Sequence, residues 1–97
     1  MITELLREGK ENRKSFRELQ QQTGIKDERR LRRVIEIERR QGALILSCAS
    51  GGYYLPANRE EVEQYDRMMR KEAKAILYTL KHCRNYLKTT ENYSLKN

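Results

Sequence analysis

The chain has little of the side-chain chemistry from which active sites and metal centres are built. Its one histidine is His82, and its two cysteines, Cys48 and Cys83, form no C-x-x-C pair. A zinc site would therefore lack ligands of the usual type and spacing, and we expect two free thiols in a reducing cytoplasm. Because adjacent helical side chains diverge by about 100°, His82 and Cys83 are unsuited to act as a base and its nucleophile.

Glycine and long apolar runs are scarce as well. Gly51 and Gly52 are adjacent, but no G-x-x-x-x-G-K-[ST] pattern surrounds them. We expect no catalytic residue, no metal and no cofactor, and hence no enzyme. The sequence has no run of about 18 apolar residues, so we expect no membrane-spanning helix. The first ten residues, MITELLREGK, lack the basic-then-apolar order of a signal peptide. These absences predict a cytoplasmic protein without a membrane partner.

Charge is the abundant property. Hydrophobic residues make up 37% of the 97-residue chain and charged residues 36%. Such a composition suits one small domain with much exposed helix surface, or one whose core a second subunit completes. Lysine and arginine total 21 against 14 acidic residues, a net charge of +7. An excess of this sign favours polyanionic partners, chiefly nucleic acid or an anionic membrane surface.

Apolar spacing and turn residues predict three helices in the first half. Residues 2–8 predict a short helix that ends at Gly9. Ser15 and Glu18 form a capping-box pattern before a second helix, which the glycine of Thr23-Gly24-Ile25 ends. Asp27 is the expected N-cap of a third helix, which runs to about Gln41.

Two strands and a long helix are expected to follow. Residues 43–47 and 53–55 predict a β-hairpin around Ser50-Gly51-Gly52, which ends at Pro56. Asn58 and Glu61 predict a cap for a helix to about Leu87. The expected division is residues 1–57, a winged helix-turn-helix domain; 58–88, an amphipathic dimerisation helix; and 89–97, a flexible tail. The fold class is α+β, mostly α.

The third helix has two contrasting faces. At 100° per residue Leu31, Val34 and Ile35 share the core side. The opposite side bears Lys26, Arg29, Arg30, Arg32, Arg33 and Arg40. Arginine suits bidentate contact with guanine or phosphate, so this face predicts binding in the DNA major groove, although any amphipathic helix can present a solvated charged face.

Glu38 and Ile37 conflict with this wheel, because Glu38 falls on the core side and Ile37 toward solvent. Either the helix distorts near its end, or Glu38 is exposed there and Ile37 packs on another element. Both alternatives stay open at this point.

The hairpin tip, Cys48 to Gly52, contains no lysine or arginine. The hydroxyls of Ser47 and Ser50, together with backbone amides, are the candidate phosphate contacts there. We expect Tyr53 or Tyr54 to pack beneath the hairpin rather than to stack on bases.

The long helix has a continuous apolar stripe. With Val62 at its start, the stripe continues through Tyr65, Met69, Ala73, Ile76, Leu80, Cys83 and Leu87. One small domain cannot cover so long a face, so we expect a homodimer, antiparallel or crossed, through this helix. The alternative is that the helix, and its first half in particular, folds back over Ile2, Leu5 and Leu6 of its own chain. The outer face, with Arg67, Lys71, Lys74, Tyr78 and Lys81, is expected to be mainly solvated.

Four segments together resemble bacterial and prophage winged-helix proteins. They are Thr23-Gly24-Ile25, Leu31-Arg32-Arg33-Val34-Ile35, Gln41-Gly42-Ala43-Leu44-Ile45 and Gly52-Tyr53-Tyr54-Leu55-Pro56, followed by the acidic helix start Glu60–Tyr65. The resemblance covers roughly residues 12–87 and implies sequence-specific double-stranded DNA binding, as a transcription regulator or phage replication accessory. Two departures are Glu38, where these sequences usually have an apolar residue, and the uncharged wing. The alternative function is a protein-interaction module on a winged-helix scaffold.

Overall fold

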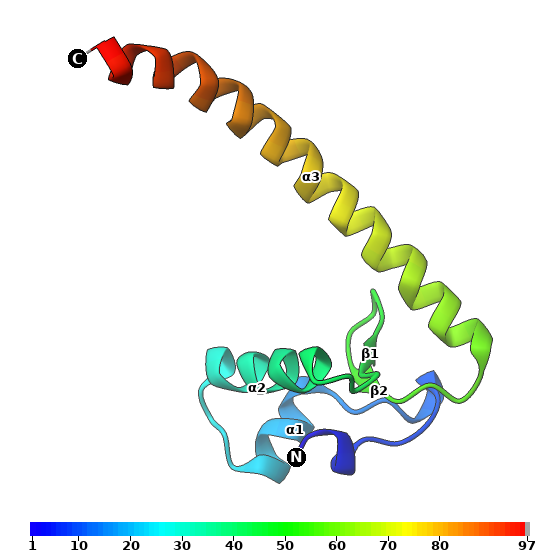
Figure 1. Ribbon diagram of the computed structural model, residues 1–97. Coiled ribbons are helices and arrows are strands. Elements are labelled where there is room, and N and C mark those ends of the chain that lie inside the picture. The colour runs from blue at the N-terminus through cyan, green and yellow to red at the C-terminus, as the bar shows by residue number, and fades with distance from the viewer. Residues whose placement is uncertain (97) are drawn as a thin grey trace. The chain divides into compact units, whose positions relative to one another are not determined.

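A computed structural model describes residues 1–96 and the side chains of residues 1–89. The elements in chain order are the 3-10 turns η1 (Thr3–Leu5) and η2 (Lys10–Asn12), the helices α1 (Phe16–Thr23) and α2 (Glu28–Arg40), the strands β1 (Leu46–Ser47) and β2 (Tyr53–Tyr54), and the helix α3 (Arg59–Lys96) (Figure 1). The chain is mostly helical with one antiparallel hairpin, which confirms the expected class.

The chain forms two compact units, Met1–Tyr65 (unit 1) and Asp66–Asn97 (unit 2), of which Asn97 lies outside the described residues. The expected boundary after residue 57 is therefore too early. Residues 59–65, the first turns of α3, belong to unit 1.

The expected caps of unit 1 are confirmed. Ser15 Oγ accepts a hydrogen bond from the Glu18 amide at 3.1 Å, and the Glu18 carboxylate accepts one from the Ser15 amide at 3.4 Å. Gly24 ends α1 in the left-handed region at φ 76°, which a glycine adopts without the Cβ clash of other residues. Asp27 then caps α2 by accepting from the Arg29 amide at 3.0 Å. The turn between α1 and α2 is thus fixed by residues close in sequence.

The core of unit 1 is formed by buried side chains from α1, α2 and the segments on either side of them. Its members are Ile2, Leu6, Leu19, Leu31, Ile35 and Ile45, each 7% exposed or less. Phe16 and Val34 are partly buried against this cluster. The inward positions that the wheel assigned to α1 and α2 are therefore confirmed, and both helices present their charged faces outward.

The helix expected over residues 2–8 is wrong. Only the single 3-10 turn η1 forms there, and Glu8 then pairs with Leu55 in an isolated parallel bridge. The Gly9 amide donates to the Leu55 carbonyl at 2.8 Å, and the Leu55 amide donates to the Arg7 carbonyl at 2.9 Å. Lys14 pairs with Tyr53 in the antiparallel sense, and each amide donates to the other's carbonyl at 2.9 Å. Hydrogen bonds to the backbone around the hairpin thus satisfy the amide and carbonyl groups that a helix would have paired internally.

The hairpin is present but shorter than expected. β1 and β2 pair Leu46 with Tyr54 and Ser47 with Tyr53. Tyr54 is 2% exposed, and its burial raises the pKa of the phenol. The Tyr53 ring lies 6.4 Å from the Phe16 ring. Both tyrosines are thus packed within unit 1, as expected.

The helix α3 begins as its cap residues predict. Asn58 Oδ1 accepts from the Glu61 amide at 2.9 Å. The Glu61 carboxylate accepts from the amides of Ala57 and Lys10, both at 2.9 Å, and these bonds hold the pKa of Glu61 below its usual range. The contact with Lys10 joins the start of α3 to η2.

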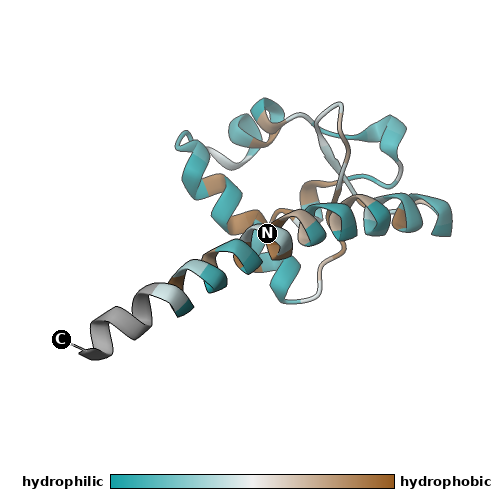
Figure 2. Cartoon of the chain, turned by 90° about the horizontal axis from the view of Figure 1, so that it is seen from above, coloured by the Kyte–Doolittle hydropathy of each residue, from teal (hydrophilic) through white to brown (hydrophobic). Residues whose placement is uncertain are grey.

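The same helix continues to Lys96, well beyond the end expected near residue 88. The segment 89–96, which was expected to form a tail after the helix, continues α3, because it has neither glycine nor proline to stop a helix. Hydrophobic and hydrophilic residues are interspersed along α3 (Figure 2). Within the described residues, accordingly, no helix has both the length and the apolar content for a membrane span.

Candidate nucleic-acid interface

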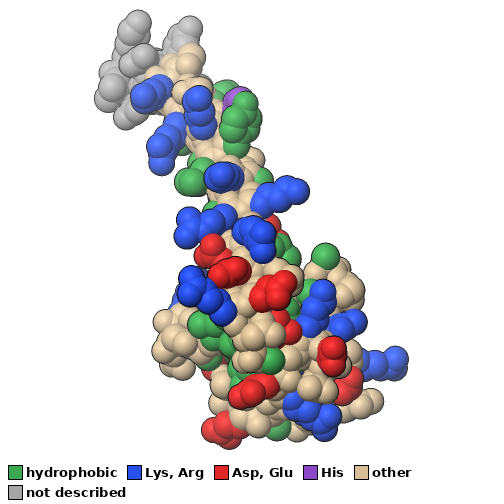
Figure 3. Space-filling model, turned by 90° about the vertical axis from the view of Figure 1, so that its right-hand side faces the viewer, with side chains coloured by type: hydrophobic (Ala, Val, Ile, Leu, Met, Phe, Trp, Pro, Cys, Tyr) green, Lys and Arg blue, Asp and Glu red, His purple; other side chains and the backbone are tan. Residues whose placement is uncertain are grey.

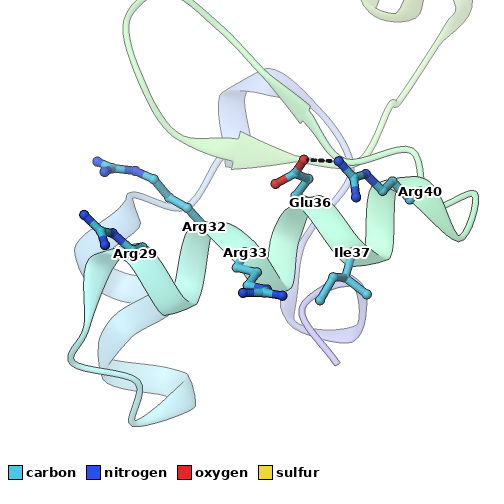
Figure 4. Close-up of a pocket in the computed structure, with 6 residues that line it drawn as sticks. All are labelled: Arg29, Arg32, Arg33, Glu36, Ile37 and Arg40. Atoms are coloured by element: carbon cyan, nitrogen blue, oxygen red, sulfur yellow. Dashed lines mark hydrogen bonds and ion pairs between the residues drawn. The ribbon is translucent and has the colours of Figure 1, made fainter.

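The outer face of α2 forms a shallow groove within unit 1. Six side chains line the groove: Arg29, Arg32, Arg33, Glu36, Ile37 and Arg40 (Figure 4). Four of the residues predicted from the sequence as DNA contacts therefore lie together. Arg30 is also exposed but lies outside the groove.

The arginines on the outer face of α2 form two sets, those with an acidic partner and those without one. Arg40 forms an ion pair with Glu36 at 2.6 Å, and Arg32 pairs with Glu28 at 3.7 Å. The Arg32 guanidinium also lies over the Phe16 ring, 5.1 Å from its centroid.

The remaining three arginines on this face are Arg29, Arg30 and Arg33. Among the residues whose side chains are described, their guanidinium groups form no ion pair or hydrogen bond. Five guanidinium donors each are thus available on these three side chains for an external acceptor.

Lys26 lies in a second hollow, at the turn between α1 and α2. Its other lining residues are Arg17, Gln20, Gln21 and Gly24. The Lys26 carbonyl accepts a hydrogen bond from the Gln20 amide side chain at 2.9 Å, which fixes the turn against α1. Arg17 was missed in the sequence, although its position on the outer face of α1 was a usable signal. Two cations thus flank the turn.

The hairpin tip gains a cation from elsewhere in the chain. Ser50 and Gly52 line a hollow with Arg13 and Phe16. A Cβ built on Gly52 would lie 2.8 Å from the Arg13 Cδ atom, so the arginine packs directly on this glycine. The sequence could not indicate this proximity, because it depends on the pairing of Lys14 with Tyr53. The hollow also contains Glu11 and Glu18, so its charge is mixed.

Ser47 does not share that location. Its side chain is half-buried, and its Oγ accepts a hydrogen bond from Arg39 Nη2 at 3.4 Å. Ser50 is exposed at the tip, with its Oγ 3.2 Å from Cys48 Sγ. Of the two predicted hydroxyl contacts, only Ser50 lies on the surface.

Arg39 joins α2 to the hairpin and to α3. Its Nε donates to the Ile45 carbonyl at 2.8 Å. Its guanidinium lies over two rings of unit 1, 5.8 Å from the Tyr53 centroid and 5.6 Å from that of Tyr65. Arg39 therefore has a structural role distinct from that of its neighbours, in keeping with its absence from the arginine face assigned to DNA.

The structure matches neither alternative for Glu38 and Ile37, because Glu38 lies partly buried on the core side of α2 and Ile37 is exposed. Its side chain is 12% exposed and points inward, while Ile37 is 44% exposed. The carboxylate accepts from the amides of Ile2 at 2.8 Å and Thr3 at 3.1 Å, and from the Thr3 hydroxyl at 2.9 Å. The terminal amine of Met1 lies 3.2 Å away. Glu38 thus caps η1 from a distant helix.

These contacts determine the ionisation of Glu38. Burial by itself raises the pKa of a carboxyl group, but the hydrogen bonds from Ile2, Thr3 and the terminal amine outweigh it. The net effect lowers the pKa of Glu38 to about 2. The side chain is therefore charged under all ordinary conditions.

The apolar stripe of α3 differs between the two units. Tyr65 is half-buried beside Arg39 in unit 1, so the dimer surface assigned to it is already partly occupied. In unit 2 the stripe is exposed: Met69 by 39%, Ile76 by 61% and Leu80 by 43%. Ala73 and Cys83 are exposed too, as is Leu87 by 60%. Lysines and arginines surround hydrophobic side chains along much of this helix (Figure 3).

No cluster of three or more histidine, cysteine or acidic side chains that could hold a metal ion occurs in the part of the chain that the structure describes. No family model matches the chain, and no curated protein or solved structure matches it either.

Proposed function

We propose that the chain binds double-stranded DNA in a sequence-dependent manner, with α2 in the major groove. The observation on which this proposal rests is the outer face of α2, where Arg29, Arg30 and Arg33 have no ion-pair or hydrogen-bond partner among the described side chains. A helix of this width fits the major groove, and arginine forms bidentate contacts with guanine O6 and N7. Unpaired guanidinium groups lose no internal partner on binding.

In this proposal unit 1 is a winged helix-turn-helix, with α1 and α2 as its two helices and the β1–β2 hairpin as its wing. The sharp turn at Gly24 and the hairpin directly after α2 support that assignment. In this proposal Arg17 and Lys26 at the turn contact phosphates on one side of the groove, and Arg13 beside the hairpin tip contacts phosphates on the other. The role is that of a transcription regulator or a phage-type replication accessory.

We further propose that the chain acts as a homodimer through the exposed stripe of α3 in unit 2. A second copy would remove from water apolar side chains such as Ile76 and Leu80, which one chain leaves exposed. A dimer would also recognise a two-fold symmetric site.

Selection of bound sequences from a random duplex pool tests the DNA proposal. An enriched motif is expected, on which Arg33→Ala weakens binding about tenfold or more in a mobility-shift assay. Arg59→Ala is the matched control, because it removes one charge from a side chain that is 92% exposed and lies outside α2. Equal affinities of the two variants would contradict the assignment of α2.

The second candidate is a protein-interaction module, favoured by the exposed apolar side chains of α3. It predicts no enriched sequence, weak binding to any duplex, and a tight protein partner for α3. The selection experiment thus separates the two functions.

A further inference from the structure

One apolar side chain lies within the charged groove on α2. Ile37 is 44% exposed, whereas the five other side chains that line the groove are charged. It contributes nothing to the buried core of unit 1, to which α2 supplies Leu31 and Ile35. A β-branched residue also favours a helix slightly less than the straight-chain residues around it. Neither the core nor the helix therefore accounts for isoleucine at this position.

The position of Ile37 relative to Arg33 is well defined. Both side chains project from the same side of α2, one turn apart (Figure 4). Four residues of helix correspond to a rise of about 6 Å, close to that of two base pairs. Arg33 is one of the three unpaired arginines, so an apolar group and a free guanidinium occupy neighbouring sites on one face.

The acidic residue of the groove, Glu36, already has an ion-pair partner. Glu36 is bound to Arg40 at 2.6 Å, on the other side of the helix from Ile37 (Figure 4). The Glu36 carboxylate is therefore directed away from the side of the helix that carries Arg33 and Ile37. What the face offers beside Arg33 is a hydrophobic surface.

Unmodified DNA presents a single apolar group in its major groove, the 5-methyl group of thymine. We propose that Ile37 contacts that methyl group and makes the chain select a thymine within about three base pairs of the base that Arg33 contacts. The inference rests on the proposed insertion of α2 into the major groove. It adds a residue that determines specificity by shape and hydrophobicity instead of by a hydrogen bond.

The test replaces each thymine of the selected site, one at a time, by deoxyuridine, which pairs identically but lacks the methyl group. Loss of contact with one buried methyl corresponds to an affinity decrease of about fourfold. The wild-type chain should show that decrease at one thymine, near the base pair at which Arg33→Ala relaxes specificity. Replacement elsewhere should have little effect.

Variants assign the effect to the side chain. Ile37→Ala should bind thymine and deoxyuridine equally at that position, and Ile37→Val should retain part of the preference. Leu44→Ala is the matched control: Leu44 is 47% exposed but lies outside the groove, so its removal should leave the preference unchanged. Thermal unfolding of each variant checks that the fold is intact.

Two results would overturn the inference and are distinguishable from failure of the proposed function. If the wild-type chain binds its selected site with equal affinity after every replacement, α2 reads DNA without Ile37. The same conclusion follows if Ile37→Ala retains the wild-type preference. Absence of any selected sequence overturns both the inference and the proposed DNA reading.

Discussion

The carboxylate of Glu38 accepts a hydrogen bond at 2.8 Å from the amide of Ile2, which is 36 positions earlier in the chain. A charged residue on the inner side of α2 thereby satisfies the start of η1, whose own cap residue provides no side-chain acceptor. The orphan amides at a helix start need such an acceptor when they are shielded from water. This contact positions the segment that contributes Ile2 and Leu6 to the core.

Glu38→Gln should destabilise unit 1. An amide oxygen is a weaker acceptor than a carboxylate and cannot accept all four hydrogen bonds, so we expect a loss of about 2 kcal/mol in the free energy of unfolding. Glu36→Gln is the matched control, since Glu36 is 58% exposed and its pair with Arg40 should contribute under about 0.5 kcal/mol. Urea denaturation at neutral pH measures both variants. Similar losses for the two would contradict a special role of Glu38.

The pKa of Glu38 predicts how stability depends on acid. The folded pKa of about 2 lies below the ordinary value of 4.5 for a glutamate, so the unfolded chain binds a proton more readily. The contribution of Glu38 is therefore complete above about pH 5 and declines as pH falls toward 2, by about 2 to 3 kcal/mol. Urea denaturation from pH 7 to pH 2 should show this decline. In Glu38→Gln the decline should be smaller by the same amount, and an unchanged profile would count against the mechanism.

Arg39→Lys should destabilise unit 1 although the charge is kept. Lysine cannot donate to Ile45 and Ser47 together while lying flat over the rings of Tyr53 and Tyr65. We expect a loss of about 1 to 2 kcal/mol in the free energy of unfolding. Arg40→Lys is the matched control. It makes the same substitution at an exposed ion pair, and the free energy of unfolding should fall by less than about 0.5 kcal/mol. Thermal unfolding distinguishes them, and equal melting temperatures would show that the contacts of Arg39 add no stability.

Ile76→Ser and Leu80→Ser should weaken self-association through α3. Each change removes an exposed apolar group from the stripe without altering charge, so the surface covered by a second copy loses hydrophobic area. Tyr78→Ser is the control, because Tyr78 is 68% exposed on the outer face of the helix. Light scattering over a concentration series should give a lower dimer fraction for the first two variants alone. A monomer at every concentration of the wild-type chain would contradict the homodimer.

Salt should act in opposite directions on the two proposed interactions. DNA binding releases counterions, so three phosphate contacts predict a decrease of about fortyfold in the affinity of one copy between about 50 and 200 mM salt, and the six contacts of a dimer predict about 2,000-fold. Residues 66–89 contain seven basic and two acidic side chains, which repel a second copy. Screening should therefore strengthen the dimer as salt rises. Parallel mobility-shift and light-scattering titrations measure the two trends, and a dimer that weakens with salt would indicate association through ion pairs instead.

Local patterns in the sequence were sufficient to predict the helices α1 and α2, the presence of the hairpin and the start of α3. The caps at Ser15, Asp27 and Asn58 and the left-handed glycine at Gly24 act over a few residues, so the sequence alone determines where α1, α2 and α3 begin and where α1 ends. The apolar spacing of Leu31 and Ile35 likewise fixed which face of α2 is exposed, and with it the groove that the predicted arginines share. The absence of glycine and proline after Pro56 permitted a helix longer than its apolar stripe.

Only the tertiary structure decided what depends on contacts between distant residues. Residues 2–9 formed a 3-10 turn and a backbone bridge because Glu38 and Leu55 offered partners that local periodicity cannot reveal. Arg13 reached the hairpin tip by the same backbone pairing. The helical wheel left Arg39 off the outer face of α2 but could not name its partners, the rings of Tyr53 and Tyr65. Among the outer arginines the wheel made no distinction, yet Arg32 and Arg40 are paired with acidic residues while Arg33 is unpaired. A residue's type is local information, but its partner is set by the packing of the chain around it.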